Sequence, residues 1–198
     1  MKNLAIPVNR NTTYQTTARA LLAQFAQSWK TIGSTDQAAW NAFAAVNPVI
    51  NRVGDSVTMS GFDAYCMVNC NLVNGGASST PRPMLPFTVT APTSLAATCV
   101  AGVTTLTFLP TPVPALTAYL VWGTAPQSLG KFYVENQYRL FKVFAPAAAS
   151  PQVVTTFYNT RFGAPPLVAG ARLFFAIQAV SLVNGATSQW LRASCLTT

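Results

Sequence analysis

Residues 172–196 read RLFFAIQAVSLVNGATSQWLRASCL, and this stretch decides the fold of the second half of the chain. Apolar and β-branched side chains fill residues 172–182, and a similar run occupies residues 188–196. Between them lies Asn184-Gly185, and an Asn-Gly pair between two such runs is a strong signal for a β-hairpin because both residues tolerate positive φ. We therefore predict a long strand, a tight turn at residues 183–186 and a final strand.

Shorter runs of the same kind occur upstream of this hairpin, separated by Pro, Gly and Ser. We predict strands at residues 95–100, 103–108, 116–122, 132–134, 138–144 and 152–158. Many short strands at this spacing are typical of a Greek-key sandwich of two antiparallel sheets. Residues 95–198 are thus predicted to be an all-β domain.

The first part of the chain has a different period. Over residues 16–76, apolar side chains recur at three- and four-residue steps, which is the pattern of amphipathic helices. Thr16 or Thr17 can cap the first helix, and Ser34 with Gln37 forms a capping box for the second. Ser60 with Asp63 does the same for the third. We predict a small three-helix module, with a loop or short strand at residues 51–59, that packs on a neighbour because it is too small for a deep core.

Two segments without periodicity flank this module. Residues 1–15, rich in Asn and Thr, are predicted to be an extended arm, and residues 77–94 a linker stiffened by prolines. The fold class is therefore α+β by segments: a helical module over residues 16–76, then an immunoglobulin- or fibronectin III-like sandwich over residues 95–198.

The composition suggests a protein that works in contact with others. Hydrophobic residues make up 51% of the 198 residues and charged residues only 8%. Such a surface must expose apolar area, which favours an assembly protein over an exported module with a neutral polar coat. The net charge of +8 comes from scattered bases, so a nucleic-acid partner is not expected. Neither a secretory signal nor a membrane-spanning stretch is apparent, so synthesis in a cytoplasm and no membrane partner are expected.

The residues needed for catalysis are scarce. The chain has no histidine and four acidic residues, and the motifs GxxxxGK[ST] and GxSxG do not occur. Asp36 and Asp63 fit helix starts, Asp55 fits a turn, and Glu135 fits a surface pair with Lys131 or Arg139. We expect no enzyme activity, no cofactor and no small-molecule substrate.

The four cysteines do not suggest a metal site, because no histidine accompanies them. Cys66 and Cys70 lie four residues apart on a predicted helix, too far apart for a disulfide. Cys99 and Cys195 lie near the start and end of the β region. They could be bridged, although free buried thiols are the expectation for a reducing compartment.

Two resemblances add to this interpretation. Residues 92–196 resemble a fibronectin type III or immunoglobulin-like module through PTSLAATCVAGVTTLTFLP, AYLVWGTAP and RLFFAIQAVSLVNGATSQWL, although the early Trp of fibronectin modules is missing. Residues 28–76, with SWKTIGSTDQAAWNAF and SGFDAYCMVNCNLVNGG, resemble a helical element of uncharacterised phage-encoded proteins. The second resemblance implies a structural protein of a tailed-phage particle, made in the host cytoplasm and located in the virion.

The leading hypothesis is thus a non-enzymatic virion protein that decorates or cements a capsid, or is a minor component of the particle. Its partners would be other virion proteins and copies of itself. The candidate assembly interface comprises Arg10, Arg19, Phe25, Trp29, Trp40 and Phe43. One alternative is a carbohydrate- or cell-surface-binding module that uses the sandwich loops, with an exposed Trp122 or Trp190 as a contact. Another is a basic scaffold that touches nucleic acid inside a particle.

Overall fold

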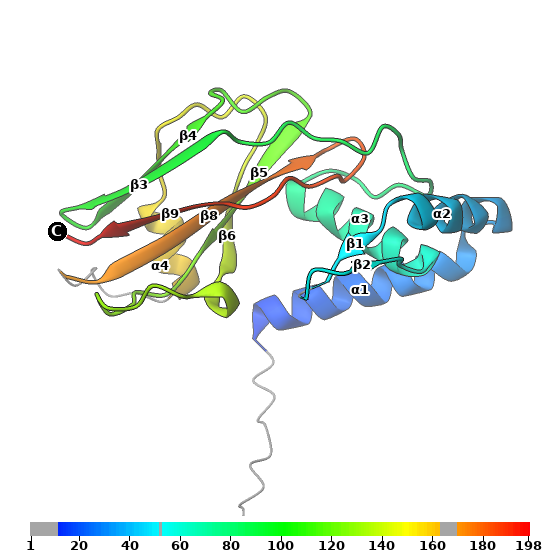
Figure 1. Ribbon diagram of the computed structural model, residues 1–198, viewed down its shortest axis with the longest axis horizontal. Helices are drawn as coiled ribbons and strands as arrows, with labels where there is room; N and C mark the ends of the chain where they lie inside the picture. Colours follow the sequence, from blue (N-terminus) through cyan, green and yellow to red (C-terminus); the bar gives the residue numbers. More distant parts are fainter. Residues whose placement is uncertain (1–11, 52, 163–169) are drawn as a thin grey trace, which may run out of the picture. The chain divides into compact units, whose positions relative to one another are not determined.

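The computed structural model describes residues 12–51, 53–162 and 170–198 (Figure 1). The chain divides into two units, Met1–Cys70 and Asn71–Thr198. This boundary lies inside a helix, whereas the sequence placed it in the Pro-rich segment 77–94. That segment belongs to the second unit, where the Asn184 side-chain amide donates hydrogen bonds to the carbonyl oxygens of Pro86 and Thr88.

Three helices and a short hairpin make up the first part of the chain. The elements are α1 (Thr13–Thr31), α2 (Ser34–Val46), β1 (Val49–Ile50), β2 (Ser56–Val57) and α3 (Gly61–Gly75). The three predicted helices are therefore present. Residues 51–59, predicted as a loop or short strand, contain β2, which pairs antiparallel with β1 so that Ile50 lies opposite Ser56.

Helix α1 begins earlier than the sequence suggested. Its cap is Thr12, whose hydroxyl accepts a hydrogen bond from the backbone N–H of Gln15 while the Gln15 side chain accepts one from the N–H of Thr12. The predicted caps Thr16 and Thr17 instead donate from their hydroxyls to the carbonyl of Thr13. The predicted arm 1–15 is thus helical from Thr13, and its residues 1–11 lie outside the described part.

Of the other two predicted caps, the structure confirms that of α3 but not that of α2. Gly33, rather than Ser34, caps α2, without a side-chain hydrogen bond. The Gln37 side chain donates instead to the carbonyl of Trp29, 2.9 Å away, which ties the start of α2 to α1. The third cap is confirmed, because the hydroxyl of Ser60 accepts from the Asp63 N–H at 3.1 Å and donates to the Asp63 carboxylate at 2.7 Å.

The first unit has an aromatic core of its own, centred on Tyr65. Its ring centroid lies 5.5 Å from those of Trp29 and Trp40 and 6.0 Å from that of Phe25. The pairs with Phe25 and Trp40 are edge-to-face, an arrangement that adds to the free energy gained from burial. The prediction that this module lacks a deep core is therefore wrong: aromatic side chains are large enough to fill the space among three short helices.

The second unit is a sandwich of two antiparallel sheets. The strands are β3 (Ser94–Val100), β4 (Val103–Leu109), β5 (Thr117–Gly123), β6 (Arg139–Phe144), β7 (Gln152–Val153), β8 (Arg172–Ser181) and β9 (Leu191–Leu196). One sheet has the order β3-β4-β7 and the other β6-β5-β8-β9. This is an immunoglobulin/fibronectin III-like arrangement, and the predicted fold class is confirmed.

The core lies between the sheets, and β5 and β8 contribute most of it. Their register places Tyr119 opposite Ala179 and Val121 opposite Ile177, all fully buried. From the smaller sheet, Phe108 stacks on Phe144 with the ring centroids 5.1 Å apart. Alternate residues of each strand point inward, as the period of two requires.

Two strand predictions are wrong. Residues 132–134 form no strand and lead into a 3₁₀ turn, η1 (Glu135–Gln137). Of residues 152–158, only Gln152–Val153 are a strand, and helix α4 (Thr155–Phe162) follows at once. The β-branched and aromatic residues there suggest a strand, but α4 buries Tyr158 in the core, and packing outweighs local propensity.

Candidate functional site

The residues predicted as an assembly interface lie mainly inside the first unit. Phe25, Trp40 and Phe43 are buried, and Trp29 packs edge-to-face on Phe62 (centroids 5.8 Å apart). These four side chains are therefore engaged within the unit. Arg19 is exposed on α1, and Arg10 lies outside the described residues.

Two of the acidic residues of the first unit have structural partners. Asp63 is part of the cap of α3, and Asp55 accepts a hydrogen bond from the side-chain amide of Asn51. Within residues 12–51, 53–162 and 170–198, no group of three or more His, Cys, Asp or Glu could hold a metal ion. Among the described helices, none is long and apolar enough to cross a membrane.

A different apolar surface occurs at the β1–β2 hairpin. Val46 at the end of α2, Ile50 and Val53 are exposed here, and we call them the hairpin patch. Val57 is also exposed, but it pairs with Val49, so its side chain points to the opposite face from that of Ile50. Val53 is 85% exposed, Val46 74% and Ile50 69%. The mixed composition of this segment resembles that of an ordinary loop, so its sequence carries no signal for an exposed apolar surface.

The turn of this hairpin is held by several hydrogen bonds. The Asn51 side-chain oxygen accepts from the N–H groups of Val53 and Asp55, both at 2.9 Å. Gly54 has a φ of 101°, which residues with a side chain rarely adopt. The hydrogen-bonded turn therefore holds the Val53 side chain exposed to solvent.

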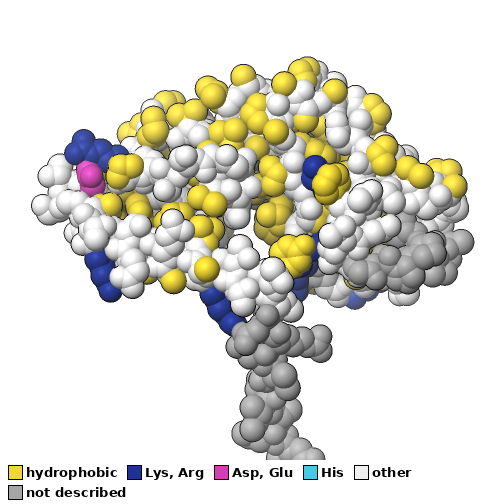
Figure 2. Space-filling view, turned by 180° about the vertical axis from the view of Figure 1, so that it is seen from behind, with side chains coloured by type: hydrophobic (Ala, Val, Ile, Leu, Met, Phe, Trp, Pro, Cys, Tyr) yellow, Lys and Arg dark blue, Asp and Glu magenta, His cyan; other side chains and the backbone are white. Residues whose placement is uncertain are grey.

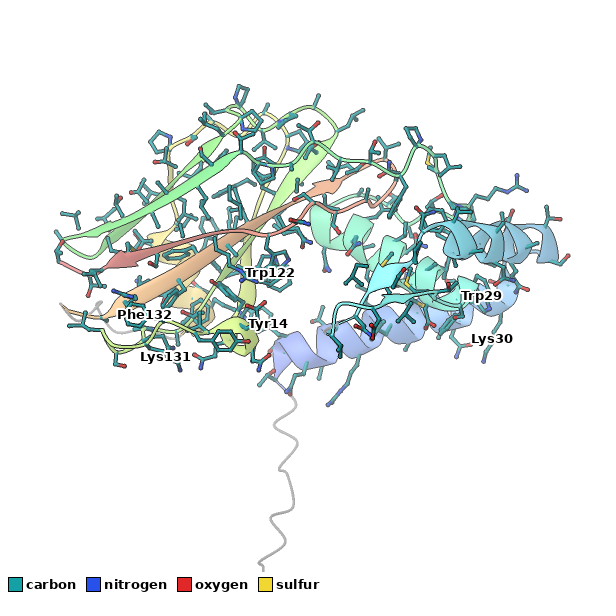
Figure 3. All side chains as sticks on the ribbon, in the orientation of Figure 1. Tyr14, Trp29, Lys30, Trp122, Lys131 and Phe132 are labelled. Atoms are coloured by element: carbon teal, nitrogen blue, oxygen red, sulfur yellow. The ribbon has the colours of Figure 1, made fainter. Side chains whose placement is uncertain are left out.

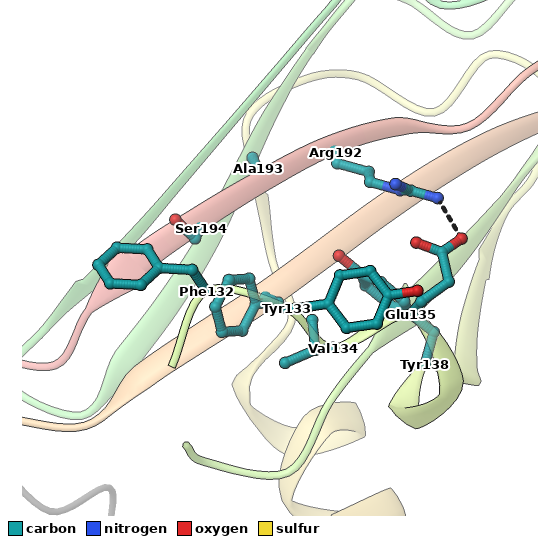
Figure 4. Close-up of a pocket in the computed structure, with 9 residues that line it drawn as sticks. Phe132, Tyr133, Val134, Glu135, Tyr138, Arg192, Ala193 and Ser194 are labelled. Atoms are coloured by element: carbon teal, nitrogen blue, oxygen red, sulfur yellow. Dashed lines mark hydrogen bonds and ion pairs between the residues drawn. The ribbon is translucent and has the colours of Figure 1, made fainter. Parts of the chain in front are cut away.

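A second candidate site is a hollow of about 450 Å³ in the sandwich, shown in Figure 4. We call it the aromatic hollow. Its lining comes from the η1 region, β8 and β9, and comprises Phe132, Tyr133, Val134, Glu135, Tyr138, Phe174, Arg192, Ala193 and Ser194. Phe132 and Tyr133 are 75% and 74% exposed, so their rings stand open to solvent. Figure 3 shows Phe132 beside Lys131 on the segment that precedes η1.

Charged groups accompany these rings. Arg192 donates to the Glu135 carboxylate at 2.6 Å, and its guanidinium lies 6.0 Å from the ring of Tyr138. A second guanidinium, that of Arg172, lies 4.5 Å from the ring of Phe132. The hollow therefore combines flat apolar surfaces with a fixed donor and a fixed acceptor.

Stacked aromatic rings support the base of this region. Trp122 of β5 and Trp190 stack with their centroids 5.0 Å apart, and Tyr138 meets Trp190 edge-on at 5.4 Å. Burial raises the pKa of the Tyr138 phenol. Trp122 and Trp190, which the sequence suggested as ligand contacts, are therefore packed on each other, and the more exposed rings are those of Phe132 and Tyr133. The sequence assigned these two to a strand and so missed them, although two adjacent aromatic residues cannot both face the core of a sheet.

Comparison with known proteins adds little to the geometry. No protein-family model matches the sequence, and no curated protein matches it either. Among solved structures, the chain is similar to the chicken interferon gamma receptor alpha chain, with 16% identity and a TM-score of 0.34. The match covers 53% of this chain and 43% of the receptor chain.

Proposed function

We propose that this chain is a non-enzymatic structural protein of a virus particle, of the capsid-decoration or minor-component type. The observation that carries the assembly part of the proposal is the hairpin patch. A fully buried Val or Ile side chain contributes about 1.5–3 kcal/mol relative to an exposed one, so the patch gains free energy when a neighbour covers it. A hydrogen-bonded turn that holds apolar side chains in water is consistent with a contact surface.

The rest of the surface supports the same role. Apolar side chains are spread over the face shown in Figure 2, with few charged side chains among them. Exposed aliphatic residues of the sandwich include Val100, Leu116 and Val153, at 61%, 64% and 61%. Surfaces of this type favour association with other proteins.

The assignment to a virus particle rests on the resemblance of residues 28–76 to a phage-encoded helical element. In this role the chain is made in the host cytoplasm, and its partners are other virion proteins and further copies of itself. We assign the interface to the hairpin patch and not to the predicted aromatic residues, because Phe25, Trp40 and Phe43 are buried in the core of the first unit.

Light scattering on the full-length chain tests the assembly role. The variant Ile50→Asp/Val53→Asp places charge in the hairpin patch, and Gln24→Asp/Gln27→Asp is its control, because it adds the same charge at exposed polar positions outside the hairpin. We expect the parent chain and the control to form oligomers and the patch variant to be monomeric. A parent chain that is monomeric at all concentrations would contradict the proposal.

The aromatic hollow favours a second candidate function, binding of a carbohydrate. The apolar C–H face of a sugar ring can lie on an aromatic ring, while its hydroxyls bind a few fixed polar groups, as is usual for concave ligand sites. Tyr133 supplies such a ring, and Arg192 and Glu135 supply a donor and an acceptor.

A glycan array followed by calorimetry tests this candidate. We expect Tyr133→Ala to weaken binding of any glycan hit at least about tenfold, since loss of one stacking contact is comparable to loss of an interface anchor. Leu129→Ala is the control, because Leu129 is also exposed, at 51%, but does not line the hollow. Equal binding by the two variants would exclude the hollow as the site.

A further inference from the structure

Two cysteines that are far apart in the sequence meet at the edge of the sandwich. Cys99 lies near the end of β3, in the three-stranded sheet, and Cys195 near the end of β9, in the four-stranded sheet. Both belong to the apolar core, where Cys99 is only 3% exposed. Both thiols are free, and the two residues belong to the same cluster of packed apolar side chains.

The backbone holds these two strands together. Cys99 pairs with Thr197 as neighbours in a parallel bridge, and the N–H of Thr198 donates to the carbonyl of Cys99 at 3.2 Å. The N–H of Ala101 donates in turn to the carbonyl of Thr198 at 2.9 Å. Cys195 is two residues before Thr197, so its side chain lies on the same face as that of Thr197. The contact between the cysteines is therefore specified by strand register.

We propose that Cys99 and Cys195 form a redox modification site, at which a small-molecule disulfide oxidises them to an intramolecular disulfide that links the two sheets. The site is distinct from the hairpin patch and from the aromatic hollow, and it does not depend on the proposed function.

The chemistry is ordinary thiol–disulfide exchange. The Cys99 thiolate attacks one sulfur of the small disulfide RS–SR, which forms a mixed disulfide and releases one RS⁻. The Cys195 thiolate then attacks the Cys99 sulfur and releases the second RS⁻. The two protons lost by the cysteines pass to the two released thiolates, so two electrons move from the protein to RS–SR and two RSH are formed.

The surroundings of Cys99 favour it as the attacking group. Hydrogen bonds from Cys195 and Thr104 lower the pKa of the Cys99 thiol to about 7, and the Thr104 hydroxyl lies 3.1 Å from its sulfur. Because β3 and β9 lie at the edges of their sheets, opening of their ends is sufficient for a reagent to reach the pair.

The bond is reversible by the same exchange chemistry, because an added thiol reductant can attack it and release both cysteine thiols.

Intact-mass spectrometry and peptide mapping of the full-length chain test the proposal. After incubation with oxidised glutathione we expect a mass lower by about 2 Da, because two hydrogens are lost, and a peptide linking Cys99 to Cys195. Dithiothreitol should restore the original mass. The control variant Cys66→Ala/Cys70→Ala should still close, because those residues lie four apart on a helix and are not expected to bridge.

Thermal unfolding and the pattern of glutathione adducts provide two further tests of the proposal. The midpoint of thermal unfolding should rise on oxidation and return on reduction, and Cys99→Ser should show neither change. Stable glutathione adducts on both cysteines without a Cys99–Cys195 link would overturn the proposal, as would unmodified cysteines after prolonged incubation. The mass and adduct results come from the parent chain and do not depend on how well a variant folds.

Discussion

The phenol of Tyr158 donates a 2.5 Å hydrogen bond to the carbonyl oxygen of Thr124, across 34 positions of sequence. Tyr158 is fully buried and belongs to α4, and Thr124 follows the end of β5. The same ring packs 5.8 Å from Phe175 and 4.7 Å from Phe162. One residue thus fixes the position of α4 on the sandwich through both packing and a polar contact.

Replacement of Tyr158 by Phe removes the hydrogen bond and keeps the ring. The Thr124 carbonyl then loses a buried donor, which costs about 1–3 kcal/mol of unfolding free energy. Urea unfolding measures this change. The control Tyr133→Phe removes a phenol that is largely exposed and should leave stability within about 0.5 kcal/mol of the parent. Equal effects of the two substitutions would show that the Tyr158 hydrogen bond adds no net stability.

Replacement of Gly61 by Ala should destabilise the first unit. A Cβ at this position would lie 2.2 Å from the Asn41 side-chain oxygen and 2.8 Å from the Asn41 backbone nitrogen. The backbone atom cannot move away by a rotamer change, so α2 and α3 must separate, at a cost of about 1–3 kcal/mol. Loss of helical signal in thermally scanned circular dichroism is the measurement. Gly130→Ala, where nothing lies within 4 Å, is the control and should leave the transition almost unchanged.

The Cys99–Cys195 pair should make stability depend on pH. The pKa of Cys99 is lowered from 9.0 to about 7, so the folded state binds fewer protons than the unfolded state between these values, and stability rises with pH. Its contribution is complete above pH 9 and is lost as the pH falls through about 7. The pKa of Cys195 is raised, by its hydrogen bond to Cys99 and by burial, so above pH 9 this residue lowers stability as the pH rises. We therefore expect a maximum near pH 9.

Urea unfolding from pH 6 to pH 10 under reducing conditions measures this profile. The double variant Cys99→Ser/Cys195→Ser removes both groups and should abolish the maximum, whatever its absolute stability. A maximum that persists in the double variant would assign the pH dependence to other groups.

The ion pair between Arg192 and Glu135 should contribute little to stability. Both side chains are almost half exposed, at 48% and 43%, and solvent screens their attraction. Glu135→Gln should therefore change the free energy of unfolding by less than about 1 kcal/mol in chemical denaturation. A loss several times larger would indicate that the carboxylate holds η1 in place.

Local patterns in the sequence determined the class of most segments, but not of residues 132–134 and 152–158. The three- and four-residue steps within residues 16–76 correctly predicted helices, and the apolar runs around Asn184-Gly185 correctly predicted the β8–β9 hairpin. The spacing of apolar side chains predicts both because it shows which face of an element is buried. The cap of α3 was also predictable, since Ser60 and Asp63 are only three residues apart.

The tertiary structure alone decided which side chains are available to a partner. Aromatic periodicity marks Trp40 and Phe43 as apolar, but only the packing around Tyr65 shows that they face the interior of their own unit. The exposure of Val53, the hollow beside Tyr133 and the meeting of Cys99 with Cys195 all depend on contacts between segments distant in sequence. Such contacts arise from strand order and register, for which the local sequence carries no separate signal.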